Sequence, residues 1–205
     1  CSPTASAIGL TDFPDNRLFF RTMPSDAVQA GELARAIERT GQQSTVIVAS
    51  DDSYGDDFAL SLAQHLGSIP FEVEASLRYD PLSDDLSGIA QQAADTEAGS
   101  IAVIGSGDSG AAMLAAVRAT GTQAQILVND AFLDPDVSAA LGDTAANILE
   151  GVTGVAIDAR PTDTAFVEAL HAKDPTVSTS FAGFAFDCAN VIALAAVAAE
   201  NDAAI

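Results

Sequence analysis

The sequence predicts an α/β fold, a parallel sheet flanked by helices on both faces. Short apolar runs at residues 45–50, 100–105 and 125–129 have the length and composition of strands buried on both faces. Segments with helical periodicity separate these runs. Strands that alternate with helices along a chain form βαβ units, and such units build a parallel sheet.

The first part of the chain alternates helix and strand. Residues 25–40 begin at Ser25, a good N-cap, and place their apolar side chains on one face, which predicts a helix. The run 45–50 predicts a buried strand, and residues 57–66 predict an amphipathic helix. Residues 71–78 alternate polar and apolar side chains, which predicts a half-buried strand.

The alternation continues toward the C-terminus. Residues 84–98 are expected to be helical, and the strand 100–105 follows them directly. Beyond the strand 125–129, a further strand is expected over 148–157. Three more helices are expected, over 110–120, 163–172 and the alanine-rich segment 179–199.

The chain is strongly acidic. Eight Lys and Arg residues face 29 Asp and Glu residues, for a formal net charge of −21. A surface of this charge repels nucleic acid and anionic membranes, so no nucleic-acid partner is expected. No run of about 18 consecutive apolar residues is apparent, and membrane insertion of this chain is not expected.

The loop Gly105–Gly110 reads G-x-G-x-x-G between an expected strand and an expected helix. With Asp130 twenty residues further on, this spacing is that of a dinucleotide-binding loop, and it predicts NAD binding as an alternative function. Asp108 argues against this alternative, because a carboxylate inside the loop repels a pyrophosphate. Asp108 and Ser109 are instead expected to cap the following helix.

Acidic pairs precede several expected helices, at 51–52, 56–57 and 84–85. Such pairs could hold a metal ion, but carboxylates at helix starts are also stabilised by the helix dipole, and that reading is favoured. No catalytic arrangement is evident, so neither enzyme activity nor a cofactor is expected. The cysteines, Cys1 and Cys188, could form a disulfide or remain as two buried thiols.

Several segments, taken in order, resemble the type I periplasmic binding proteins, and within them the receptors for branched-chain amino acids, amides and urea. The segments are Ser2–Ser6, Leu10–Thr11, Phe19–Thr22 with Ser25–Asp26, Val46–Gly55, Ile101–Gly105, Asn129–Phe132, Glu150–Val152 and Phe186–Asp187. Each motif is short, but together they extend over nearly the whole chain in the order of the family.

The resemblance implies two α/β lobes with a ligand between them. Residues 1–21 would be a remnant of the first lobe and a crossing strand, 22–155 the second lobe, and 156–205 the return to the first lobe with C-terminal helices. The opening half of the first lobe would then be absent, and the chain would be a fragment. Cys1 would be an internal residue and not a lipidation site. Cys1 and Cys188 would both lie in first-lobe remnants, so a disulfide between them becomes worth testing.

The resemblance also carries ligand contacts onto residues of the first lobe. The Thr4 carbonyl would accept a hydrogen bond from the ligand's ammonium group. The Ser6 amide and hydroxyl would bind its carboxylate, and Phe181 would form an apolar wall.

Three residues of the second lobe would complete the contacts. Tyr54 would lie against the ligand, and Asp130 would accept a charge-assisted hydrogen bond from the ammonium group. Ser106 occupies a position that is often aromatic in the family, which leaves the specificity for the ligand side chain open. Tyr54 and Asp130 also follow directly on expected strands, where functional groups of parallel sheets gather.

The function implied is binding without chemistry. The protein would be the solute-binding component of an ABC importer, periplasmic or extracellular, with an amino acid or small amide as ligand and an ABC permease as partner. Lipoprotein anchoring of the full-length parent is an option. A ligand-sensing domain of a receptor with the same fold is an alternative, besides NAD binding.

Overall fold

The computed structural model describes residues 1–177 and 179–202, and the chain divides into two compact units. Residues Asp26–Ala156 form one of them, here called the sheet unit. The other, called the terminal unit, combines Cys1–Ser25 with Ile157–Ile205.

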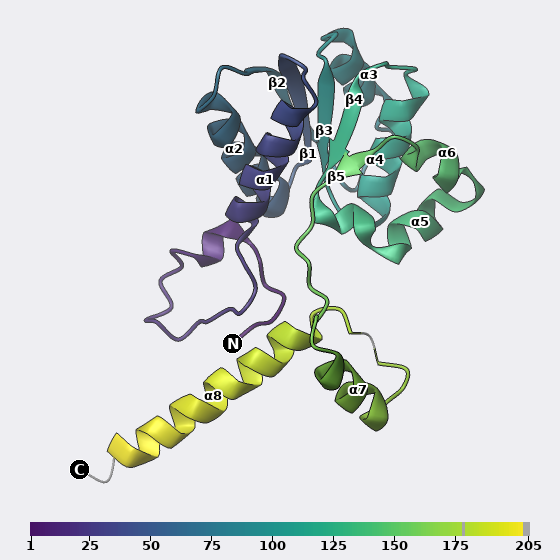
Figure 1. The fold of residues 1–205 in the computed structure, drawn as a ribbon. Coiled ribbons are helices and arrows are strands. Elements are labelled where there is room, and N and C mark those ends of the chain that lie inside the picture. Colours follow the sequence, from purple (N-terminus) through teal and green to yellow (C-terminus); the bar gives the residue numbers. More distant parts are fainter. Residues whose placement is uncertain (178, 203–205) are drawn as a thin grey trace. The chain divides into compact units, whose positions relative to one another are not determined.

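The sheet unit contains a five-stranded parallel sheet in the order β2-β1-β3-β4-β5 (Figure 1). Its strands are β1 (Ser44–Ser50), β2 (Glu72–Tyr79), β3 (Ser100–Ile104), β4 (Gln125–Val128) and β5 (Thr153–Gly154). After β2 the chain returns past β1 and continues on its other side, so the winding direction of the sheet reverses between β1 and β3.

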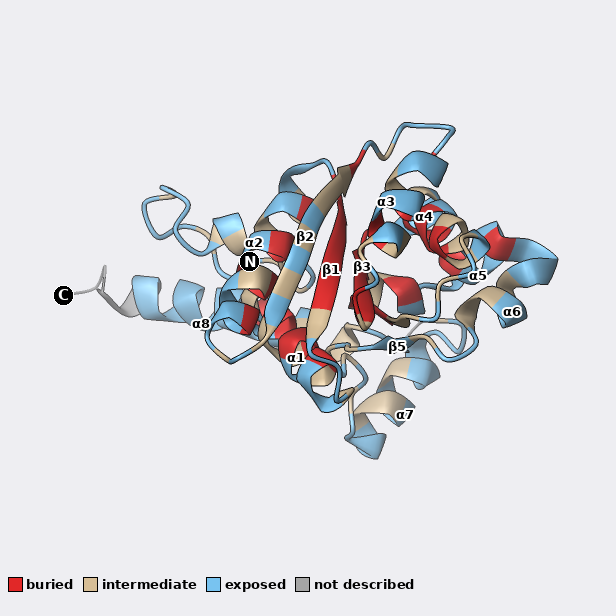
Figure 2. Cartoon of the chain, turned by 90° about the horizontal axis from the view of Figure 1, so that it is seen from above, coloured by how far each residue is buried: buried red, intermediate tan, exposed pale blue. Residues whose placement is uncertain are grey.

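Helices cover both faces of this sheet, as predicted. α1 (Asp26–Arg39) and α2 (Ser53–Gly67) lie on one face, and α3 (Ser87–Asp95) and α4 (Gly107–Ala119) lie on the other. Alternate residues of each central strand enter opposite cores: in β1, Val46 and Val48 pack against α3 and α4, and Ile47 and Ala49 pack against α1 and α2. β1 and β3 are therefore buried along almost their whole length, whereas the edge strand β2 is largely half-buried or exposed (Figure 2).

Two helices begin earlier than the sequence predicted. α2 starts at Ser53, because the Asp52 side chain caps it by accepting a hydrogen bond from the Gly55 amide at 2.8 Å. α4 starts at Gly107, with Ser106 as its N-cap residue. The prediction that Asp108 and Ser109 cap α4 was therefore wrong, since both lie in its first turn.

The expected strand over 148–157 was also largely wrong, since it is reduced to β5. After β4 the chain forms short helices: η2 (Asp130–Leu133), α5 (Pro135–Leu141), η3 (Gly142–Thr144) and α6 (Ala145–Leu149). The Arg118 side chain donates hydrogen bonds to the carbonyls of Ile148 and Glu150. These carbonyls would otherwise pair with the backbone of a neighbouring strand. Gly151 then turns the chain at a positive φ of 69°.

The terminal unit holds η1 (Ile8–Leu10), α7 (Thr164–Lys173) and α8 (Ala182–Asp202). Its opening segment forms a parallel bridge between Ser2 and Arg21. A disulfide joins Cys1 to Cys188 in α8, with Cα atoms 5.7 Å apart, which answers the question that the sequence left open about these two cysteines.

α8 bears on the expectation about membrane-spanning segments. Residues Ala182–Ala199 have a mean hydropathy of 1.8 and are long and apolar enough to cross a membrane by length and composition. The many alanines of this segment make it less conspicuous in the sequence than a run of large apolar residues. A single helix of this kind does not identify a membrane span, because core helices of soluble proteins meet the same criteria of length and composition.

Close packing of α2 on β1 gives a testable consequence. A Cβ atom at Gly55 would lie 2.1 Å from the Ser50 carbonyl oxygen, whereas one at Gly67, at the end of the same helix, would meet nothing within 4 Å. We expect Gly55→Ala to lower the free energy of unfolding by about 1–3 kcal/mol through overpacking. Gly67→Ala, the matched control, should leave it unchanged or raise it by up to about 1 kcal/mol.

Urea denaturation of the two variants, followed by circular dichroism, measures this difference. Equal stability of Gly55→Ala and Gly67→Ala would show that α2 does not approach β1 as closely as the structure places it.

Candidate ligand site at the carboxyl edge of the sheet

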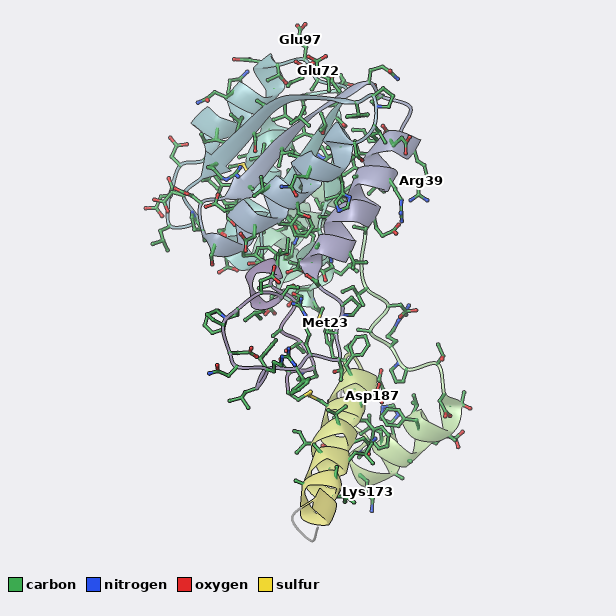
Figure 3. The ribbon with its side chains drawn as sticks, turned by 90° about the vertical axis from the view of Figure 1, so that its left-hand side faces the viewer. Met23, Arg39, Glu72, Glu97, Lys173 and Asp187 are labelled. Atoms are coloured by element: carbon green, nitrogen blue, oxygen red, sulfur yellow. A yellow bond between two sulfur atoms is a disulfide. The ribbon has the colours of Figure 1, made fainter. Side chains whose placement is uncertain are left out.

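The winding reversal between β1 and β3 marks the edge of the sheet where a site is expected. In open α/β sheets the crevice for a ligand lies outside the carboxyl ends of the strands at such a reversal. Tyr54 follows β1, Ser106 follows β3 and Asp130 follows β4, so the sheet unit brings all three predicted residues to this edge. Glu72, which begins β2, and Glu97, which precedes β3, lie at the opposite, amino end of the sheet (Figure 3).

Tyr54 is held in the first turn of α2. Its ring packs at an angle against the ring of Phe58 one turn later, with ring centroids 5.9 Å apart. The close approach of Gly55 to the end of β1 keeps this turn against the sheet. Tyr54 is half-buried, so its side chain is fixed by packing and still reaches the surface of the unit.

Asn129 connects three elements at this edge, and the sequence analysis assigned it no role. It is 1% exposed and follows β4 directly. Its Oδ1 accepts a hydrogen bond from the Gly105 amide at 3.1 Å, and its Nδ2 donates to the Gly105 carbonyl at 3.1 Å and to the Tyr54 hydroxyl at 2.8 Å. Two signals in the sequence could have indicated it: a polar residue at the end of an apolar run, and its place in the segment Asn129–Phe132 that resembles the family.

Asp130 opens η2 and is half-buried. It does not cap a helix, because the N-cap position of η2 is Asn129 and α5 is capped by Asp134. Burial raises the pKa of the Tyr54 phenol, and the carboxylates of Asp26 and Asp130 raise it further. The phenol therefore remains protonated at neutral pH and can donate a hydrogen bond beside a carboxylate that can accept one.

Ser106 is exposed at the N-cap position of α4, and its hydroxyl forms no capping hydrogen bond. The amino end of α4 also brings unpaired backbone amides to this edge, which favours anionic or acceptor groups nearby. Ser106 thus presents a small, exposed hydroxyl group at this edge.

The glycines of the loop Gly105–Gly110 are explained by packing within the sheet unit. A Cβ atom at Gly105 would lie 2.1 Å from the Tyr79 hydroxyl, and one at Gly110 would lie 3.1 Å from the Gly105 carbonyl carbon. Gly107 has a positive φ of 53°. Burial of Tyr79 beneath this loop raises its pKa to about 12. The glycine spacing is therefore accounted for without a dinucleotide.

The other three predicted residues belong to the terminal unit. The Ser6 carbonyl accepts a hydrogen bond from Arg21 Nη1 at 3.0 Å, and the Thr4 amide approaches the Ser2 hydroxyl at 3.4 Å. Phe181 has a positive φ of 60° and donates its backbone amide to the Ala159 carbonyl at 3.0 Å. The arginine contacts brace the loop that carries Thr4 and Ser6.

Across residues 1–177 and 179–202, no three His, Cys, Asp or Glu side chains are grouped in a way that could hold a metal ion. The acidic pairs have structural roles instead. Asp52 caps α2, and Asp85 accepts hydrogen bonds from the amide and hydroxyl of Ser87 at the start of α3.

Comparison with known proteins identifies relatives of this fold. A family model described as periplasmic binding protein matches residues 2–204. No curated protein matches the chain in sequence.

Among solved structures, a Rhodospirillum rubrum protein ascribed to a branched-chain amino acid ABC transporter aligns with a TM-score of 0.70 and 19% identity, over 82% of this chain and 49% of that one. A leucine binding protein from Thermotoga maritima MSB8 aligns with a TM-score of 0.66 and 17% identity, over 82% and 49% of the two chains. A branched-chain amino acid ABC transporter periplasmic ligand-binding protein from Burkholderia xenovorans LB400 gives 0.63 and 18%, over 78% and 43%.

At these identities the solved structures show a shared fold, and this chain spans about half the length of each. The family match is broader, because it extends over nearly all 205 residues. On that match the chain belongs to the periplasmic binding protein family.

Proposed function

We propose that this chain acts in an extracytoplasmic receptor that binds an amino acid or a small amide and delivers it to an ABC permease. The observation that carries the proposal is the meeting of Tyr54, Ser106 and Asp130 at the carboxyl edge of the sheet, where the winding reverses. The phenol is a donor and the carboxylate an acceptor, which together complement a ligand that carries both an oxygen acceptor and an N–H donor.

The relatives support this class of ligand. The Thermotoga maritima protein is described as a leucine binding protein, and two others as parts of branched-chain amino acid ABC transporters. In our proposal the sheet unit is the second lobe of such a receptor, and the terminal unit belongs to the first. Thr4, Ser6 and Phe181 of the terminal unit are proposed as further ligand contacts. Binding, and not catalysis, is the proposed activity.

The disulfide supports a location outside the cytoplasm. Disulfides persist in oxidising compartments such as the periplasm and are rare where glutathione and thioredoxin keep thiols reduced. The Cys1–Cys188 bond therefore fits a periplasmic or extracellular protein.

A thermal-shift screen tests the proposed ligand class. The complete product of the gene that encodes these residues, and the 205-residue chain beside it, would be heated with each L-amino acid, acetamide, urea and NAD. We expect an amino acid or an amide to raise the melting temperature, because a ligand that binds only the folded state stabilises it. Stabilisation by NAD alone would overturn the proposal and assign the loop Gly105–Gly110 to a dinucleotide.

A charge-matched pair of variants tests Asp130. We expect Asp130→Asn to weaken binding of an amine-bearing ligand found in the screen by about 10- to 100-fold, since a hydrogen bond to a charged group contributes about 1.5–3 kcal/mol. Asp108→Asn removes the same charge from the exposed first turn of α4 and is the control, with affinity within about twofold of the wild type.

Isothermal titration calorimetry of both variants gives the affinities. Equal binding by Asp130→Asn and the wild type would remove Asp130 from the site, while losses of similar size in both variants would indicate a general effect of charge.

Alkylation tests the disulfide. Because the chain contains two cysteines and both are bonded in the structure, we expect mass spectrometry to find no alkylated cysteine in protein secreted to the periplasm and unfolded without reductant. Two alkylated cysteines should appear after reduction. Alkylation of Cys1 and Cys188 before reduction would contradict both the bond and the argument for location.

A further inference from the structure

The orientation of the Asn129 amide is set by the backbone of Gly105. The Gly105 amide nitrogen can only donate, and it lies 3.1 Å from Asn129 Oδ1. The Gly105 carbonyl can only accept, and it lies 3.1 Å from Asn129 Nδ2. A rotated amide would bring two donors together and two acceptors together in a buried place, so the observed orientation is strongly preferred.

This orientation directs the second proton of Nδ2 toward Tyr54. The distance from Nδ2 to the Tyr54 hydroxyl oxygen is 2.8 Å. Both protons of Nδ2 are then used, one toward the Gly105 carbonyl and one toward Tyr54, and neither can rotate out of the amide plane. The Tyr54 oxygen therefore accepts from Asn129, and the proton of the Tyr54 hydroxyl must be directed elsewhere. Asn129 can serve only as a donor to this hydroxyl, which leaves the hydroxyl to donate to an acceptor at the site.

The electrostatic surroundings agree with this direction. The Asn129 hydrogen bond lowers the pKa of Tyr54, as a donor to the phenol oxygen should, although burial and the carboxylates of Asp26 and Asp130 outweigh it. The Tyr54 phenol thus remains protonated close to the Asp130 carboxylate. A ligand at this edge meets a fixed donor from Tyr54 and an acceptor from Asp130.

We propose that Asn129 is a positioning residue that holds the Tyr54 hydroxyl as a hydrogen-bond donor, so that the sheet unit selects ligands with an oxygen acceptor beside an N–H donor. The inference rests on the proposed function for the ligand, but the direction of the Asn129–Tyr54 hydrogen bond can be tested without one. α-Amino acids and primary amides both have this pairing of groups, whereas simple amines and simple carboxylic acids have only one of the two.

The ligand-free test uses the side-chain resonances of Asn129 in a ¹⁵N–¹H spectrum of the isotope-labelled chain. Tyr54→Phe removes the acceptor of one Nδ2 proton and leaves the other proton on the Gly105 carbonyl. We expect one of the two proton resonances to move and the other to hold. Thr120→Val is the control, since it removes a hydroxyl at the far end of α4, where Thr120 donates to the Val117 carbonyl, and it should leave both Asn129 protons near their positions.

The ligand test is a double-mutant cycle in the complete gene product, with L-leucine and acetamide as probes in calorimetry. We expect Asn129→Ala to weaken binding of the probe about tenfold, which is about 1.4 kcal/mol. In the Tyr54→Phe background the same substitution should change affinity by less than about twofold, because the hydroxyl through which it acts is gone. A purely structural role of Asn129 would weaken binding equally in both backgrounds.

Asn129→Asp adds a second check, because its carboxylate can accept from the Gly105 amide but cannot donate to Tyr54, and would instead accept the proton of the Tyr54 hydroxyl. Its loss of affinity should be at least that of Asn129→Ala, although the side chain keeps its size. Unmoved Asn129 resonances in Tyr54→Phe, or equal losses in both backgrounds, would overturn the inference. If neither probe binds the wild type, the cycle is run with the ligand found in the thermal-shift screen. If that screen finds no amino acid or amide, the proposed function fails separately, and the Asn129 resonances still decide the direction of the hydrogen bond.

Discussion

The structure depends on the burial of the central strands on both faces. β1 and β3 are short, and almost every residue of each is buried, so apolar helices must cover both sides of the sheet. Parallel pairing requires each strand to be followed by a crossover, and the α2 and α4 crossovers leave neighbouring strands toward opposite faces. The starts of α2 and α4 therefore diverge at the carboxyl edge of the sheet, and the candidate site lies beside them.

The site continues the hydrogen bonding of the sheet beyond its last paired residues. Where β3 ends, the amide and carbonyl of Gly105 would lose strand partners, and the Asn129 side chain satisfies both. The remaining proton of the same amide reaches Tyr54. A residue that the backbone needs for its own hydrogen bonds thereby also determines which way a hydroxyl at the site is directed.

The terminal unit is stabilised differently. Of its described residues, Met23 and Cys188 are the ones that are buried, so it has little apolar core of its own. The disulfide closes a separation of 187 residues, and a cross-link over so long a loop removes much of the entropy of the unfolded chain. Several large apolar side chains of α8, including Ile192 and Leu194, remain exposed, in a helix whose composition is typical of buried helices.

The sequence by itself determined the fold class, because strands that are buried on both faces, such as β1, β3 and β4, consist of continuous apolar runs that can be recognised in the sequence. It also placed Tyr54, Ser106 and Asp130 at strand ends, since chain order is enough for that. Only the tertiary structure decided the role of Asn129, which lies 24 residues from Gly105 and 75 from Tyr54 in sequence. Such contacts depend on which strands are neighbours and on side-chain directions, and periodicity within a segment specifies neither.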